Sequence, residues 1–168
     1  MEKGGIDVTH WFASLHNGRQ RLCAAVFVLL MLSAPVRAQS RWPHEQTAGA
    51  FHCHATFDLS AYQPLFNELA ALERDLADTL GVVRVREPIH IYLFSTQGMY
   101  QQYVKQYFPD VPYRRALFVK NRGPGMVFAY MNPDFAVDLR HESTHAVLHA
   151  SLPMVTLWLD EGLAEYFE

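Results

Sequence analysis

Residues 132–168 decide how the chain is interpreted: they read NPDFAVDLRHESTHAVLHASLPMVTLWLDEGLAEYFE. Between Pro133 and Pro153 no residue breaks a helix, and apolar side chains recur throughout. We predict one helix that follows Pro133, passes His149 and stops before Pro153. A second helix should begin near Leu157.

The first of these helices contains HESTH at residues 141–145. Residues four apart on a helix differ by about 6 Å along the axis and about 40° around it, so the imidazoles of His141 and His145 converge. Such a pair supplies two ligands of a tetrahedral zinc site. Glu142 points to one side, where a carboxylate reaches a water molecule and acts as general base. The alternative is an exposed helix face, but the uncharged residues around the motif favour a buried one.

A third ligand is required, and its position distinguishes families of metal enzyme. A metzincin would need glycine at position 148 and histidine at position 151, where this chain has Leu148 and Ser151. His149 lies about 12 Å from His141 along a straight helix, too far to share one ion. We therefore expect His149 to be a structural residue or to support a ligand.

The motif is followed by WLDEGLAEY at residues 158–166, and together they resemble the gluzincins. These are the metallopeptidases related to thermolysin and the membrane-alanyl aminopeptidases; more narrowly, the chain is similar to bacterial peptidase-MA-like domains of unknown function. The resemblance covers about residues 126–168 and implies that Glu161 is the third zinc ligand. Two histidines and one carboxylate also leave a fourth position open, as a catalytic zinc site requires.

Two further acidic residues flank Glu161. Glu165 follows one helical turn later on the same face, so we expect it to accept the outer N–H of His141 and fix that ring. The alternative for Glu165 is a solvated surface carboxylate. We expect Asp160 to be a surface or capping residue.

The fold class is predicted to be α+β, because strands come first and two helices last. The resemblance implies a zincin-like catalytic lobe: a small mixed sheet whose antiparallel edge strand packs on the zinc helix, with the C-terminal lobe of the related peptidases missing. The expected upstream elements are a strand at 50–57, a helix at 62–80 between a Ser60 cap and Gly81, a strand at 89–94, a helix from a Ser95 cap through Tyr107, and a hairpin of 116–119 with 125–131.

The substrate of such an enzyme is a peptide or protein. In the related peptidases an antiparallel edge strand just before the zinc helix binds the substrate backbone. Residues 125–131 take that place in this chain. The candidate substrate-binding residues are therefore Met126, Val127, Phe128, Ala129 and Tyr130.

The N-terminus has the order of an export signal. Arg19 and Arg21 precede an apolar run at residues 22–34, and Val36-Arg37-Ala38 forms a small-residue cleavage site. We predict a signal peptide at 1–38, which makes the protein secreted or periplasmic. An uncleaved membrane anchor is the alternative.

After this signal we expect a polar linker at 39–49 and one metallopeptidase domain at 50–168. Of the two cysteines, Cys23 lies inside the signal, so Cys53 would remain alone and form no internal disulfide. A net charge of -3 gives no reason to expect nucleic acid as a partner. We expect no membrane association after cleavage.

Other histidines were candidates for a second metal ion. His52 and His54 share one face of a predicted strand, which makes a second ion conceivable. Ordinary strand packing is the favoured interpretation, because no nearby residue completes a ligand set. His44 and His90 have no partner that the sequence identifies.

Two functions from different classes follow. The first is zinc-dependent hydrolysis of peptide bonds by an exported gluzincin-type metallopeptidase, with Glu142 as base and His141, His145 and Glu161 as metal ligands. The second is an exported, non-catalytic domain that holds zinc or binds a partner.

Overall fold

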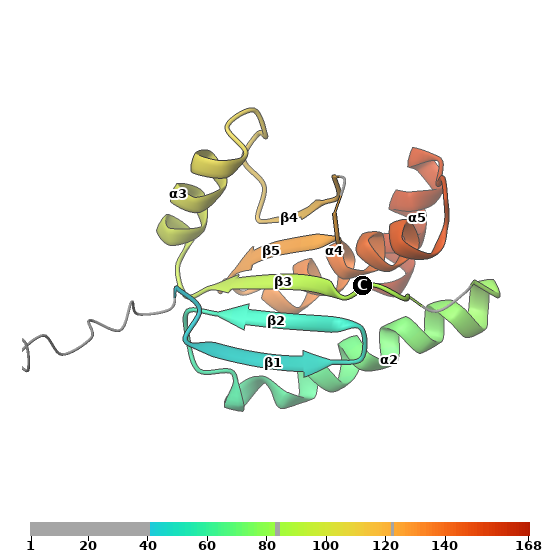
Figure 1. Ribbon diagram of the computed structural model, residues 1–168, viewed down its shortest axis with the longest axis horizontal. Helices are drawn as coiled ribbons and strands as arrows, with labels where there is room; N and C mark the ends of the chain where they lie inside the picture. Colours follow the sequence, from blue (N-terminus) through green and yellow to red (C-terminus); the bar gives the residue numbers. More distant parts are fainter. Residues whose placement is uncertain (1–40, 83–84, 122) are drawn as a thin grey trace, which may run out of the picture. The chain divides into compact units, whose positions relative to one another are not determined.

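A computed structural model describes residues 41–82, 85–121 and 123–168, which belong to the unit Ser40–Glu168 (Figure 1). The predicted signal peptide at 1–38, with Cys23, lies outside the described residues. Within the described part, no helix combines the length and the apolar character needed to cross a membrane. The elements are β1 (His44–Ala48), β2 (Phe51–Ala55), the 3₁₀ turn η1 (Ser60–Tyr62), α2 (Gln63–Leu80), β3 (Ile89–Phe94), α3 (Gln97–Tyr107), β4 (Ala116–Val119), β5 (Met126–Tyr130), α4 (Phe135–Ser151) and α5 (Leu157–Phe167).

The five strands form one mixed sheet in the order β1-β2-β3-β5-β4 (Figure 1). The three central strands β2, β3 and β5 run parallel, and β1 and β4 pair antiparallel with them at the two edges. The predicted α+β class is confirmed at this level. Both helices predicted for residues 132–168 are present, and so is the hairpin that precedes them.

The linker predicted at 39–49 is wrong for residues 44–48, which form β1. This strand pairs with β2 along its whole length, and Gly49 turns the chain between them with φ of +59°. The segment is polar because β1 is an edge strand whose side chains are largely open to solvent. Polarity alone therefore does not distinguish an edge strand from a linker.

The strand at 125–131 was expected at the edge of the sheet, and this is wrong. β5 lies between β3 and β4, and β4 is the edge strand beside α4. The physical reason is burial: Val127, Phe128, Ala129 and Tyr130 are all buried, as in a strand covered on both faces. β4 is shorter and more exposed.

Helices cover both faces of the sheet. The apolar side of α2 and of α4 packs on one face, in a core that includes Phe51, Ile91, Leu69 and Leu139. Helix α3 packs on the opposite face against the β3–β5 end, where Tyr100 is buried beside aromatic strand residues. α2 ends at Leu80, before the stop predicted at Gly81, and Gly81 itself has the left-handed conformation.

At the starts of two helices, α2 and α3, the predicted capping residues are not the ones found in the structure. Ser60 belongs to η1, and Asp58 accepts its amide N–H, so the turn precedes α2 and does not cap it. At α3 the cap is Thr96 and not Ser95: the Thr96 hydroxyl accepts the amide of Met99. In both cases adjacent hydroxyl or turn residues compete for one capping position.

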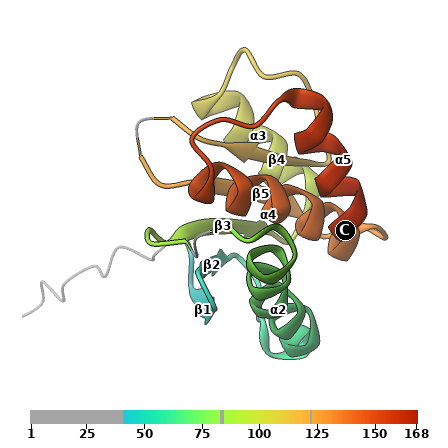
Figure 2. The same cartoon turned by 90° about the vertical axis from the view of Figure 1, so that its right-hand side faces the viewer.

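Helices α4 and α5 lie side by side (Figure 2), and this contact positions the candidate site. α5 buries Asp160, Ala164 and Phe167, whereas Leu157 and Trp158 are each 75% exposed. The hydrophobic face of α5 is therefore narrow, and polar residues occupy much of its contact with α4.

Candidate metal centre

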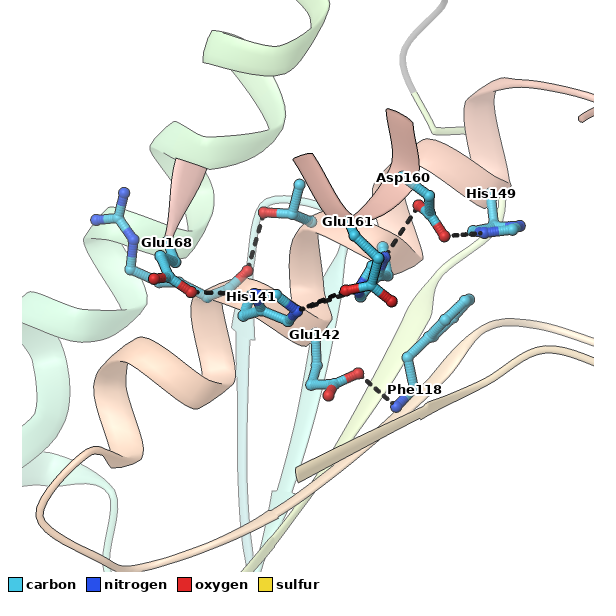
Figure 3. A network of polar contacts seen from close by, with 10 residues as sticks. Phe118, His141, Glu142, His149, Asp160, Glu161 and Glu168 are labelled. Carbon is cyan, nitrogen blue, oxygen red and sulfur yellow. Dashed lines mark hydrogen bonds and ion pairs between the residues drawn. The ribbon is translucent and has the colours of Figure 1, made fainter. Parts of the chain in front are cut away.

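Three side chains from α4 and α5 bring possible ligand atoms together (Figure 3). His141 Nε2 and His145 Nε2 are 3.2 Å apart, and Glu161 Oε2 lies 3.6 Å from the first and 3.7 Å from the second. Two nitrogen ligands of a tetrahedral zinc ion are about 3.4 Å apart, given bonds of about 2.0–2.1 Å. The spacing and the donor types fit, so this group could hold a metal ion.

The outer nitrogen of His145 faces Asp160. His145 Nδ1 is 2.9 Å from Asp160 Oδ1, while Asp160 Oδ2 is 2.9 Å from His149 Nε2 (Figure 3). The first contact is an ion pair and is not counted among the hydrogen bonds. His149 does not belong to the three-residue ligand group. It contacts the Asp160 carboxylate, which also faces His145.

The expectation that Asp160 is a surface or capping residue is wrong. Its side chain is buried, and the Thr156 residue before it has the cap position of α5. Burial raises the pKa of Asp160, but contacts with His145 and His149 outweigh burial and hold that pKa below its usual value. Asp160 therefore carries its negative charge beside the histidines.

The outer nitrogen of His141 faces Glu168, and the expected partner Glu165 does not make this contact. Glu168 Oε2 is 3.0 Å from His141 Nδ1 (Figure 3). Glu165 is exposed on α5. Glu168, the residue directly after the last residue of α5, makes the contact instead. Spacing on α5 alone could not reveal the difference.

Glu142 lies beside the ligand group and contacts β4. Its Oε2 accepts the backbone N–H of Phe118 at 2.7 Å (Figure 3). Burial raises the pKa of Glu142; the positive charges of His145 and His141, together with the Phe118 amide, act in the opposite direction. The carboxylate is thus held near the candidate metal ligands without belonging to their group.

A cleft of about 320 Å³ opens over this group. Its walls come from α4, α5, β4 and the loop before β4. Arg114 in that loop and Leu117 on β4 had no sequence signal that linked them to the site, because only folding brings the loop next to α4. The lining residues beyond the four site residues are Val111, Pro112, Arg114, Leu117, Phe118 and Asp160.

The five candidate substrate-binding residues on β5 do not line this cleft, and their role in substrate binding stays a prediction. β5 is hydrogen-bonded on both sides, to β3 and to β4, and has no free backbone edge. The free edge belongs to β4, where the Phe118 amide points away from β5 and toward Glu142.

Together, the group has ligands for a divalent ion, a half-buried carboxylate beside them and an open approach from solvent. Such an arrangement is suited to hydrolysis by an activated water molecule. Comparison with protein-family models and with curated proteins finds no match to the chain.

Proposed function

We propose that this chain carries the active site of a zinc-dependent peptidase of the gluzincin type. The observation that supports it most is the convergence of His141, His145 and Glu161, whose ligand atoms all lie within 4.8 Å of one another. Imidazole and carboxylate are ligands that zinc prefers, and three protein ligands leave one position open for catalysis.

The chain's own residues supply the proton transfers. Zinc in such a ligand set lowers the pKa of water and polarises a carbonyl group. Glu142 accepts the proton of the attacking water and passes it to the leaving amine. Its raised pKa suits both steps, because a base with a pKa nearer neutrality also returns the proton more readily.

We propose that an extended substrate pairs with β4 and not with β5. β4 is the edge strand nearest the cleft, and its Phe118 amide already faces the site. Pairing of backbones gives affinity with little preference for sequence. The cleft would then place a scissile bond between β4 and the α4 ligands.

The location of the enzyme is a part of the proposal that depends on the sequence alone. The charged and apolar order of residues 19–38 supports export and cleavage after Ala38. N-terminal sequencing of exported protein should give Gln39 as the first residue. A mature protein that still begins near Met1 would contradict cleavage and favour an anchored form.

The test of the function combines zinc analysis with hydrolysis of an unfolded protein substrate. Purified protein should contain about one tightly bound zinc per chain, and a chelator should abolish hydrolysis. His141→Ala, His145→Ala and Glu161→Ala should each lose most of the zinc and the activity. Glu165→Ala, a change of an exposed carboxylate on the same helix as Glu161, is the matched control.

Each outcome separates the possible functions. Zinc that binds tightly without hydrolysis of any tested substrate would favour a non-catalytic domain. Full zinc content in the Glu161→Ala variant would move the third ligand elsewhere. Hydrolysis that persists in the His141→Ala and His145→Ala variants would show that the activity does not come from this site.

A further inference from the structure

The sheet face opposite α2 and α4 carries three histidines near the β1 edge. The register places His54 opposite Glu45 of β1, and it places His52 opposite His90 of β3. These side chains alternate with the buried Cys53 and Ile91 and therefore point away from the main core. Strands β1, β2 and β3 lie next to one another in Figure 1.

The sequence identified no partner for His90, and the structure shows one. His54 Nε2 and His90 Nδ1 are 3.1 Å apart, with their rings inclined by only 16°. The third histidine is close: the ring centroids of His52 and His90 are 5.7 Å apart. The sequence did not reveal this cluster because parallel pairing of β2 with β3 joins residues separated by the whole of α2.

The spacing of the two nitrogen atoms suits a shared metal ion. About 3.4 Å separates two nitrogen ligands of a tetrahedral ion, against 3.1 Å for His54 and His90. The histidine pair on α4 has nearly the same spacing, at 3.2 Å. The spacing of two imidazole nitrogens in the first group is therefore repeated here by two strands, whereas the third converging ligand of the first group has no counterpart within the same distance in the described residues.

Glu45 orients one of these rings. Its Oε1 lies 3.1 Å from His54 Nδ1, which is the nitrogen that faces away from His90. A carboxylate that accepts the Nδ1 proton leaves the lone pair on Nε2, directed toward His90; carboxylate–histidine pairs of this kind support metal ligands.

We propose that His54 Nε2 and His90 Nδ1 form a second site for a divalent transition-metal ion, with His52 as a third ligand after a change of its side-chain rotamer. His52 is exposed and therefore free to make that change. Open coordination positions and all-imidazole donors suit Zn²⁺ and Cu²⁺. The site lies on the opposite sheet face from α4, so it does not share residues with the candidate metal centre.

The test is a titration of the full chain, already loaded with one equivalent of zinc, with further Zn²⁺. We expect a second equivalent to bind. His54→Ala and His90→Ala should each weaken it at least tenfold, and Glu45→Gln should weaken it roughly tenfold, a typical effect of losing an outer partner. His44→Ala is the matched control: His44 is also on β1 but faces the other side of the sheet, opposite the buried Ala55. It should leave the second equivalent unchanged.

Two further measurements keep the outcome interpretable. Circular dichroism and thermal unfolding of each variant should match the parent, so that lost binding is not lost folding. With Cu²⁺ in the His141→Ala/His145→Ala variant, electron paramagnetic resonance should show coupling to at least two imidazole nitrogens. The proposal is overturned if no second equivalent binds, or if folded His90→Ala protein binds it as well as the parent. The Glu45–His54–His90 contacts would then be a hydrogen-bonded chain without a metal.

Discussion

The imidazole of His145 on α4 and the carboxylate of Asp160 on α5 are paired, with Nδ1 2.9 Å from Oδ1. The same carboxylate reaches His149 one turn further along α4. A single buried acid thus connects two histidines of one helix to the neighbouring helix. It fixes which nitrogen of His145 is left to face a metal ion, since the other nitrogen is turned toward Asp160.

Asp160→Asn should weaken zinc binding by roughly 10–100-fold, because a supporting carboxylate keeps a ligand histidine oriented and basic. The change preserves size but removes the charge next to His145. Competition with a chromophoric chelator at pH 7.5 measures the effect. Glu165→Gln, on the exposed side of the same helix, should change the affinity by less than about twofold. Equal losses in both variants would mean that net charge, and not the His145 contact, sets the affinity.

The stability of the metal-free protein should respond to Asp160 in a pH-dependent way. The pKa of Asp160 is lower in the folded chain than its ordinary value of 3.8. A carboxyl of this kind stabilises the fold above its unfolded pKa, and the contribution is lost as the pH falls through the folded pKa. Asp160→Asn should therefore lower Tm at neutral pH and have less effect at acid pH. A constant difference between pH 7 and pH 3 would argue against a charged Asp160.

Glu142→Gln should abolish most hydrolysis without loss of zinc. The glutamine keeps the size of the side chain but cannot accept the water proton, so activity should fall by at least roughly a hundredfold. Its effect on stability should be small or favourable at neutral pH, since burial already raises the pKa of this carboxyl. Zinc analysis and hydrolysis assays on the same preparation check both points. If zinc were lost as well, Glu142 would be a ligand and not a base.

The sequence predicted the helices and strands whose signals are local. The motif-bearing helix, its successor and the 116–131 hairpin could be recognised because periodicity, proline and glycine lie within the segments themselves. Strand order could not be recognised in this way. That β5 is central and β4 peripheral, and that a polar segment pairs as β1, depends on contacts between distant residues.

The residues of the candidate site also fall into two groups: those predicted from local spacing and those that depend on the packing of distant segments. His141 and His145 converge because of spacing within one helix, which the sequence displays. The partners of these rings depend on how α5 crosses α4, and so Glu168 and Asp160 were missed while Glu165 was wrongly chosen. The identity of the metal and the peptidase activity stay predictions.

The Cys53 thiol should resist modification in the folded protein. It faces the core from β2, and burial raises its pKa to about 12, so almost no thiolate exists at pH 8. In protein that starts at Gln39, or in a Cys23→Ser variant of the full chain, a disulfide reagent such as dithionitrobenzoate should release colour only after denaturant is added. Rapid reaction without denaturant would mean that the helix-covered face of β2 opens readily.

Gly49→Ala should destabilise the protein by about 1–2 kcal/mol, because Gly49 has φ of +59° and other residues are strained there. The added Cβ would also lie 3.2 Å from Glu73 Oε2 and 3.4 Å from the Ala70 Cα of α2. Gly98→Ala on α3 is the control, since its Cβ would meet nothing within 4 Å. Urea unfolding measures both. Equal stability of the Gly49→Ala variant and the parent would argue that residues 44–48 are not held as β1.

The narrow apolar contact of α5 has a consequence for local unfolding. Leu157, Trp158 and Tyr166 are each at least 75% exposed, so hydrophobic burial on α5 is limited to a narrow side that includes Ala164 and Phe167. A metal ion held by Glu161 and the α4 histidines would cross-link α5 to α4. At a free metal concentration of a hundred times Kd, this binding would favour the state in which α5 is packed on α4 by about 2.7 kcal/mol. Amide hydrogen exchange in α5 should then slow as free zinc rises, while exchange in β3 stays the same. The fraction of molecules in which α5 is packed on α4 would thus rise with the zinc concentration of the surroundings.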